Sequence, residues 1–178
     1  ACPVCSPTRA SILTGKNPAH LQFTGHITAI NMHRFPPFGR IIPPQDKMYV
    51  DLDEIMIPEA LKPLGYKSIS IGKWHVGITE DYFPTKQGFD INIAGYERGA
   101  PPTYWGPYKK PKNYHNTSIK NMDEGKPVEY LTDRLTDEAI NFIRANKKYP
   151  FFIYLSHYAV HTPLEAPESL VRKYEKKL

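Results

Sequence analysis

Cysteine is scarce in this sequence, with two among 178 residues. Two cysteines are too few for a small domain that depends on several disulfides. No apolar run has the length of a transmembrane helix, and neither an internal repeat nor a low-complexity segment is present. No signal peptide is visible. Because the chain does not begin with Met and opens inside a motif, we interpret it as an internal fragment, whose ends do not indicate a compartment.

The composition is typical of one globular domain with a hydrophobic core, since 40% of the residues are hydrophobic and 23% are charged. Eighteen prolines predict many ordered loops. The formal charge of +5 favours anionic partners such as sulfated or phosphorylated substrates. Much of this charge lies in runs such as "RANKKYP" and "RKYEKKL", which are more typical of solvated faces.

Helical and extended patterns alternate along the chain. Apolar spacing and helix-ending residues predict helices at 7–14, 51–64, 129–148 and from 167 or 168 onward, and strands at 66–75, 151–158 and, briefly, 89–95. This order predicts an α/β fold with a mostly parallel central sheet flanked by helices. The continuous apolar run "FFIYLSHY" is typical of a strand buried on both faces.

The stretch "CPVCSPTRASILTG" contains both cysteines. Pro is favoured at the first position of a helix, so we expect Ser6 as the N-cap and Pro7 as the first helical residue. Cys5 would then lie just ahead of a helix N-terminus, where anions bind readily, and Arg9 could fold back over it. A metal clip, a redox pair and a buried structural cysteine remain alternatives at this point.

Polar side chains follow two of the predicted strands. Lys73 and His75 come directly after "SISIG", and residues two apart in an extended chain face the same way. A lysine can bind a tetrahedral oxyanion as a point charge, and an imidazole can exchange protons near neutral pH. His157 and His161 follow the other strand, where Pro163 disfavours a helix. Because sites form beyond the carboxyl ends of parallel strands, these groups are candidates for one anion site.

Three segments of the chain resemble motifs of the type I sulfatase family of the alkaline phosphatase-like superfamily. "CSPTRASILTG" matches its signature Cys-x-Pro-x-Arg followed by x-x-x-Thr-Gly, "GYKSISIGKWHVG" resembles its second signature, and "HTP" resembles its later histidine segment. The resemblance implies that residues 1–178 are part of a single sulfatase catalytic domain that lacks its first strand and its later half here. The sheet would therefore be incomplete in this chain.

The resemblance also implies the chemistry of the cysteine motif. Cys5 would be oxidised to formylglycine (3-oxoalanine) by a formylglycine-generating enzyme or an anaerobic sulfatase-maturing enzyme. One hydroxyl of the hydrated aldehyde would attack sulfur, and the second would lose a proton so that sulfate leaves. Cys2 lies outside the signature and is interpreted as structural.

Further site residues follow from the resemblance by position. Arg9 would hold the hydrated aldehyde, Lys73 would bind a sulfate oxygen, His75 would be the base for sulfate release, and His161 would assist departure of the alcohol. One divalent metal ion, Ca²⁺ in most of the family, would bind modified Cys5 and ligands that lie outside this chain. We expect the isolated fragment to be inactive for this reason.

The implied function is hydrolysis of sulfate esters, and we interpret the basic, aromatic-rich residues 101–116 as a surface for sulfated glycans. A phosphomonoester or phosphodiester hydrolase on the same scaffold is the alternative, followed by a non-catalytic polyanion-binding module. Nucleic acid is not an expected partner, and no segment is expected to span a membrane. The resemblance implies a periplasmic or secreted protein.

Overall fold

The computed structural model of the chain describes residues 2–27, 46–110 and 117–177. Its main helices are α1 (Cys5–Thr14), α2 (Ile57–Leu61), α3 (Leu131–Asn146) and α4 (Glu168–Glu175), and its strands are β1 (Lys67–Gly72), β2 (Ile91–Ile93) and β3 (Phe151–Ser156). Short 3-10 helices lie at Lys62–Leu64, Glu80–Tyr82 and Pro84–Lys86. Helices and strands are interspersed along the chain, and the strands form one parallel sheet, which confirms the predicted α/β class.

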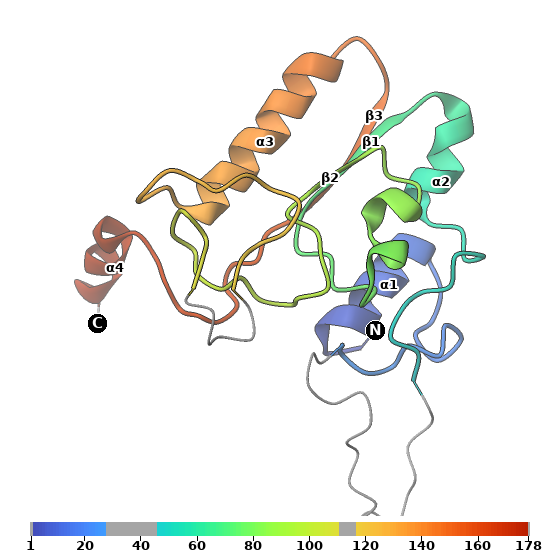
Figure 1. The fold of residues 1–178 in the computed structure, drawn as a ribbon, viewed down its shortest axis with the longest axis horizontal. Helices are drawn as coiled ribbons and strands as arrows, with labels where there is room; N and C mark the ends of the chain where they lie inside the picture. The colour runs from blue at the N-terminus through green and yellow to red at the C-terminus, as the bar shows by residue number, and fades with distance from the viewer. Residues whose placement is uncertain (1, 28–45, 111–116, 178) are drawn as a thin grey trace, which may run out of the picture.

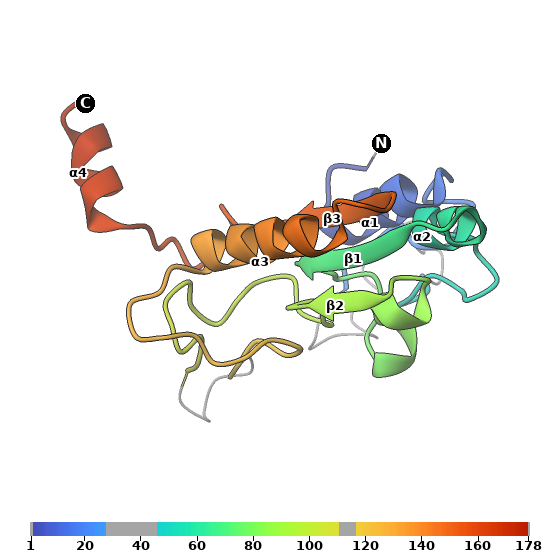
Figure 2. The ribbon, with the colours of Figure 1, turned by 90° about the horizontal axis from the view of Figure 1, so that it is seen from above.

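The described part of the sheet has the strand order β2-β1-β3, and both pairings are parallel. Ile69 of β1 lies opposite Ile91 of β2 and Ile153 of β3. All three strands therefore run in one direction, and their carboxyl ends lie at the same edge (Figure 2). Helix α3 covers one face of these strands, whereas α1 lies on the opposite side (Figure 1).

Helix α3 is amphipathic, as the sequence predicted. Its buried residues recur at the three- and four-residue spacing of one helix face, and they are Leu131, Leu135, Ala139 and Phe142. Each buried leucine contributes about 1.5–3 kcal/mol relative to an exposed one. This face packs on β1 and β3 and fixes the helix over the strands that carry the candidate site.

Two predicted helix starts are wrong. Helix α1 begins at Cys5 with Val4 as the N-cap, so Cys5 is the first helical residue and Ser6 is not the cap. Ser6 is fully buried within the first turn, where its hydroxyl accepts a hydrogen bond from the Ile27 N–H at 3.1 Å. Helix α2 begins only at Ile57, and the segment before it is irregular.

Both helix ends agree with the sequence. Gly15 and Gly65 adopt the left-handed backbone conformation, with φ of 72° and 77°, directly after the last helical turns. Glycine adopts this conformation without a steric penalty.

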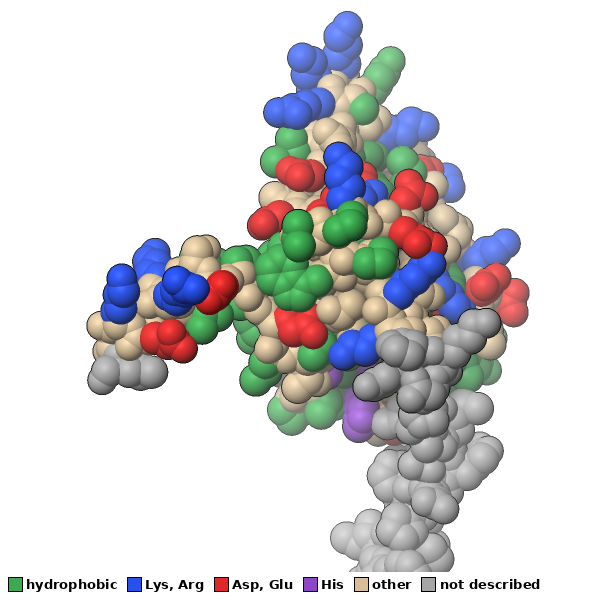
Figure 3. Space-filling view, turned by 60° about the vertical axis from the view of Figure 1, so that its left-hand side comes forward, with side chains coloured by type: hydrophobic (Ala, Val, Ile, Leu, Met, Phe, Trp, Pro, Cys, Tyr) green, Lys and Arg blue, Asp and Glu red, His purple; other side chains and the backbone are tan. Residues whose placement is uncertain are grey.

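Strand β3 is less buried than predicted. Its residues are half-buried, apart from the exposed Leu155, because β3 is paired only with β1 among the described strands. Beyond it, α4 begins at the predicted position but projects from the body of the molecule and contains no buried residue (Figures 1 and 3). Within the described residues, no helix combines the length and apolarity needed to cross a bilayer.

Candidate active site

The end of β1 turns sharply at Gly72. This residue has a φ of 92°, and a Cβ placed on it would lie 2.2 Å from the Ser156 carbonyl oxygen. Only glycine fits a position that combines a positive φ with so close a backbone approach. The following N–H, that of Lys73, donates to the same carbonyl at 2.7 Å. Lys73 and the residues after it thus leave the sheet beside the end of β3.

His75 is held on several sides. Its backbone has a φ of 58°, which is unusual for a residue with a side chain, and its N–H donates to the Tyr96 carbonyl at 3.2 Å. The imidazole Nε2 lies 2.7 Å from the Ile27 carbonyl oxygen, and Nδ1 lies 3.2 Å from Cys5 Sγ. Gly99 lies against the ring, since a Cβ there would approach His75 Cε1 to 2.5 Å. The imidazole therefore has one defined position beside Cys5.

Two basic side chains are buried beside Cys5. Lys73 is 4% exposed, and burial lowers the pKa of its ammonium group. The charge interaction with Cys5 opposes this lowering of the pKa, which places the ammonium group near the cysteine. Burial, followed by the charge of Lys73, lowers the pKa of His75 to about 3, so the imidazole is neutral at pH 7. The setting of Cys5 thus combines a neutral imidazole with a nearby lysine.

Arg9 connects helix α1 with the ends of two strands. Its Nη1 donates to the Lys73 carbonyl oxygen at 2.8 Å, to the Tyr154 hydroxyl at 3.3 Å and to the Ser156 hydroxyl. A guanidinium has five N–H donors, and these bonds use one nitrogen. Arg9 therefore holds the helix against the sheet and adds a permanent positive charge beside Lys73.

Cys5 lies at a helix start, a position that favours anions. It is the first residue of α1, where backbone N–H groups lack helical partners and the helix dipole is positive. Cys2 and Cys5 are both free thiols, and Cys2 Sγ faces the Thr24 carbonyl oxygen at 3.7 Å.

His161 does not contact this cluster through any hydrogen bond that the described residues form. Its imidazole is exposed and lies beside the side chain of Thr162, while its backbone carbonyl accepts from the Tyr104 hydroxyl at 2.9 Å. His157 is half-buried, and burial lowers its pKa. The structure therefore brings Cys5 together with the two basic residues after β1, and a role for His161 stays a prediction.

The described residues contain no group of three or more His, Cys, Asp or Glu side chains that could hold a metal ion. The acidic stretch before α2 is engaged elsewhere, because Asp51 pairs with Lys47 and Glu54 pairs with Lys16. The prediction that the remaining metal ligands lie outside this chain stays open. Cys5 is the one residue here to which the resemblance assigns metal contact.

Two tyrosines of the aromatic segment differ from the expected glycan surface. Tyr104 and Tyr108 are only 2% and 1% exposed, so they belong to the core and cannot stack on a sugar ring. Their hydroxyls bond to the His161 carbonyl oxygen and to the Glu129 carboxylate. Residues 111–116 of the same segment lie outside the described residues.

Sequence reasoning missed four residues that hold the cluster. Tyr154 and Ser156 bond to Arg9, Ile27 accepts from His75, and Gly99 lies against the imidazole. Ser156 ends a strand at the edge where a site was expected, which is a usable signal. Ile27 contributes only its backbone and Gly99 only its lack of a side chain, so their residue types give no comparable signal.

Comparisons with known proteins show the family of the chain. The family model described as Sulfatase matches residues 1–177 of the chain. The chain belongs to the sulfatase family. It is 31% identical over 182 residues to the N-acetylgalactosamine-6-sulfatase of Mus musculus, an alignment that covers 93% of this chain and 32% of that relative. The chain thus spans about a third of the length of such sulfatases.

Two solved structures share the fold over 98% of the chain. The structure titled "Crystal structure of Ps i-CgsB in complex with k-i-k-neocarrahexaose" has 27% identity and a TM-score of 0.69, with 39% of its own chain covered. That of BT4656 "in complex with its substrate D-Glucosamine-2-N, 6-O-disulfate" has 26% identity and a TM-score of 0.61, with 28% covered. The three-stranded sheet described here therefore corresponds to part of the larger fold of these structures.

Proposed function

We propose that the protein carrying this chain hydrolyses sulfate esters of glycans, with a formylglycine made from Cys5 as the nucleophile. The observation that supports this most strongly is the contact of 3.2 Å between Cys5 Sγ and His75 Nδ1, beside the buried Lys73. Sulfated sugars are favoured because the relatives include an N-acetylgalactosamine-6-sulfatase and a structure with a disulfated glucosamine as substrate.

Positive charge around residue 5 would bind the sulfate group. Lys73 lies near the cysteine and would contact a sulfate oxygen, while the start of α1 offers backbone N–H donors. Arg9 would hold the oxygens on residue 5 with donors that its bonds to the strands leave free. Such prearranged donors act more strongly in a site without bulk water than in solution.

His75 would act as the base that accepts a proton from residue 5. The Ile27 carbonyl oxygen can only accept, so Nε2 carries the hydrogen and Nδ1 of the neutral ring has a lone pair directed at Cys5. The hydrated aldehyde supplies two hydroxyls on one carbon, one to attack sulfur and one whose deprotonation expels sulfate. A base directed at residue 5 is what the second event requires. His161 would assist the leaving alcohol.

A divalent metal ion, with Ca²⁺ as the candidate, would act as a Lewis acid beside residue 5. Modified Cys5 is the residue of this chain that would contact it. A formylglycine-generating or anaerobic sulfatase-maturing enzyme would be the maturation partner, and the site of action would be the periplasm or the cell exterior.

Hydrolysis of phosphate esters is the competing function, because both anions are tetrahedral. The test compares the sulfate and the phosphate ester of one phenol as substrates for the full-length, modified protein. We expect faster turnover of the sulfate ester, and we expect Cys5→Ala to abolish it. Preference for the phosphate ester would assign the same site to phosphoryl transfer, and turnover that survives Cys5→Ala would exclude the proposed nucleophile.

A further inference from the structure

Four groups form a closed chain of contacts beside the candidate nucleophile. Ser6 Oγ accepts from the Ile27 N–H at 3.1 Å, the Ile27 carbonyl lies 2.7 Å from His75 Nε2, and His75 Nδ1 lies 3.2 Å from Cys5 Sγ. Cys5 and Ser6 are neighbours in α1. Ser6 is fully buried, and Ile27 and His75 are each 4% exposed, so water does not readily replace these bonds.

The Ile27 carbonyl determines which ring nitrogen of His75 carries the hydrogen. A carbonyl oxygen has no hydrogen to donate, so its hydrogen bond requires the hydrogen on Nε2 of His75. In the neutral ring, the lone pair is then on Nδ1, which faces residue 5. A displaced carbonyl would release this constraint, because either ring nitrogen can carry the hydrogen when no partner selects one.

Ile27 itself needs an anchor, since it lies in a loop without regular secondary structure. Its N–H donates to the Ser6 hydroxyl, and the Ser6 backbone is fixed in the first turn of α1. The backbone of one residue thus receives its position from the residue next to the nucleophile through its N–H and positions the imidazole through its carbonyl. The buried hydroxyl explains why a residue with N-cap character lies inside the helix.

We propose that Ser6 is a positioning residue, which anchors Ile27 so that its carbonyl holds His75 with Nδ1 directed at the side chain of residue 5. The geometric part of this proposal is independent of the reaction. Its catalytic consequence rests on the proposed sulfatase function, in which His75 accepts a proton from residue 5.

Ser11 provides a matched control. It lies in the same helix, and its buried hydroxyl has no hydrogen-bond partner among the described residues. Ser6→Ala and Ser11→Ala remove the same atom from the same helix, but only the first removes the Ile27 anchor. Thermal unfolding of both variants reports any general loss of stability.

The primary test is NMR of full-length protein with ¹⁵N-labelled histidine, with the His75 signals assigned from their loss in His75→Asn. In the parent protein and in Ser11→Ala, we expect a ring with hydrogen on Nε2 alone and slow solvent exchange of that hydrogen. In Ser6→Ala, we expect exchange to become at least about tenfold faster, or the two ring forms to mix. Identical His75 spectra and exchange rates in the two serine variants would overturn the proposal.

Kinetics test the consequence separately. A displaced orienting group lowers turnover by about tenfold or more, so kcat of Ser6→Ala should fall by about tenfold while KM changes by less than about twofold. Ser11→Ala should retain the parent kcat.

If no variant hydrolyses sulfate esters but the NMR effect occurs, the positioning role stands and the proposed function fails. If the parent protein is active and the Ser6→Ala spectrum matches that of Ser11→Ala, the positioning role fails alone.

Discussion

The guanidinium of Arg9 donates a hydrogen bond of 2.8 Å to the backbone carbonyl oxygen of Lys73. The same nitrogen also bonds to the Ser156 hydroxyl, so one side chain of α1 joins the ends of β1 and β3. Because Lys73 is the first residue after β1, this link fixes the point from which its side chain leaves the sheet. Arg9 thus has a structural function that is separate from any contact with substrate.

Removing the Ser156 hydroxyl should loosen this link. We expect Ser156→Ala to lower the free energy of unfolding by about 1.5–3 kcal/mol, the usual contribution of a hydrogen bond to a charged group. Urea denaturation of the full-length protein measures the change. Thr136→Ala is the control, because its hydroxyl bonds to the Thr132 carbonyl on the exposed side of α3 and should contribute less than about 0.5 kcal/mol. Equal losses of unfolding free energy in Ser156→Ala and Thr136→Ala would show that the bond between Arg9 and Ser156 adds no stability.

Local sequence rules predicted which helices form, and where they end, better than they predicted the first residue of each helix. The left-handed glycines that end α1 and the 3-10 helix Lys62–Leu64 were predictable, because they depend on neighbouring residues. The same holds for the apolar periodicity of α3. The start of α1 was not, because the Ser6 hydroxyl serves Ile27, twenty-one residues further along the chain. Hydrophobic Leu52 and Ile55 suggested an earlier start of α2, yet both are exposed.

The candidate site was predictable where side-chain chemistry carries the signal. Cys5, Lys73 and His75 were expected together from parallel-strand geometry and from the family motifs, and the structure places them in contact or close to it. Ile27 and Gly99 could not be found in this way, since one contributes a carbonyl and the other an absent side chain.

Modification should be confined to Cys5. Only Cys5 matches the Cys-x-Pro-x-Arg motif and lies beside His75 and Lys73, whereas Cys2 Sγ faces the Thr24 carbonyl oxygen. After co-expression with a maturing enzyme, peptide mass spectrometry should find formylglycine at residue 5 and an intact thiol at residue 2. An active protein in which residue 5 is entirely unmodified cysteine would contradict the proposed mechanism.

The basic side chains around residue 5 should be needed for turnover. We expect Lys73→Ala, His75→Ala and His161→Ala to lower kcat by roughly 10²-fold or more each, because lost charge stabilisation and lost proton transfer have effects of that size. Steady-state kinetics on a phenol sulfate ester measures each variant.

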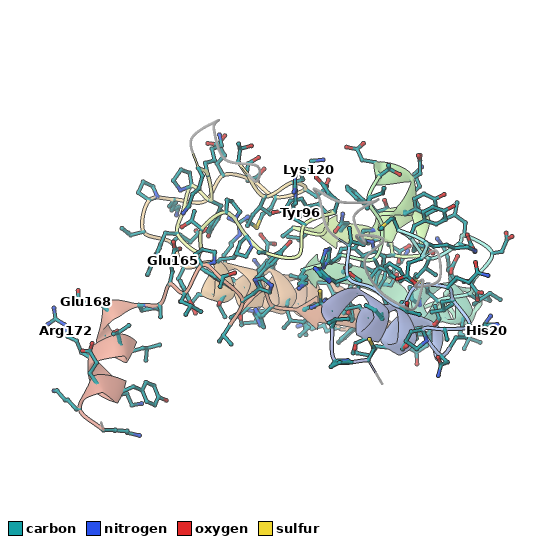
Figure 4. All side chains as sticks on the ribbon, turned by 90° about the horizontal axis from the view of Figure 1, so that it is seen from below. His20, Tyr96, Lys120, Glu165, Glu168 and Arg172 are labelled. Atoms are coloured by element: carbon teal, nitrogen blue, oxygen red, sulfur yellow. The ribbon has the colours of Figure 1, made fainter. Side chains whose placement is uncertain are left out.

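The control for these variants is His20→Ala, which replaces an exposed histidine at the edge of the molecule (Figure 4). This change should leave kcat within about twofold of the parent. A comparable loss in His20→Ala would mean that the losses in the other variants reflect damage to the fold. An unchanged kcat in His161→Ala alone would remove His161 from the site, a result that its exposed position permits.

Space at Gly99 should set the position of the imidazole. An added Cβ would lie 2.5 Å from His75 Cε1, closer than atoms of folded proteins pack, so the ring must move away from its place between Cys5 and Ile27. We therefore expect Gly99→Ala to lower kcat by about 10²-fold, the scale of a misplacement of about 1 Å. The matched control is Gly25→Ala, whose Cβ would meet, among the described residues, the Asp46 carboxylate, a group at the end of a side chain. Wild-type kcat in Gly99→Ala would mean that the ring can shift without consequence, and equal losses in both variants would indicate a general effect of the added methyl group.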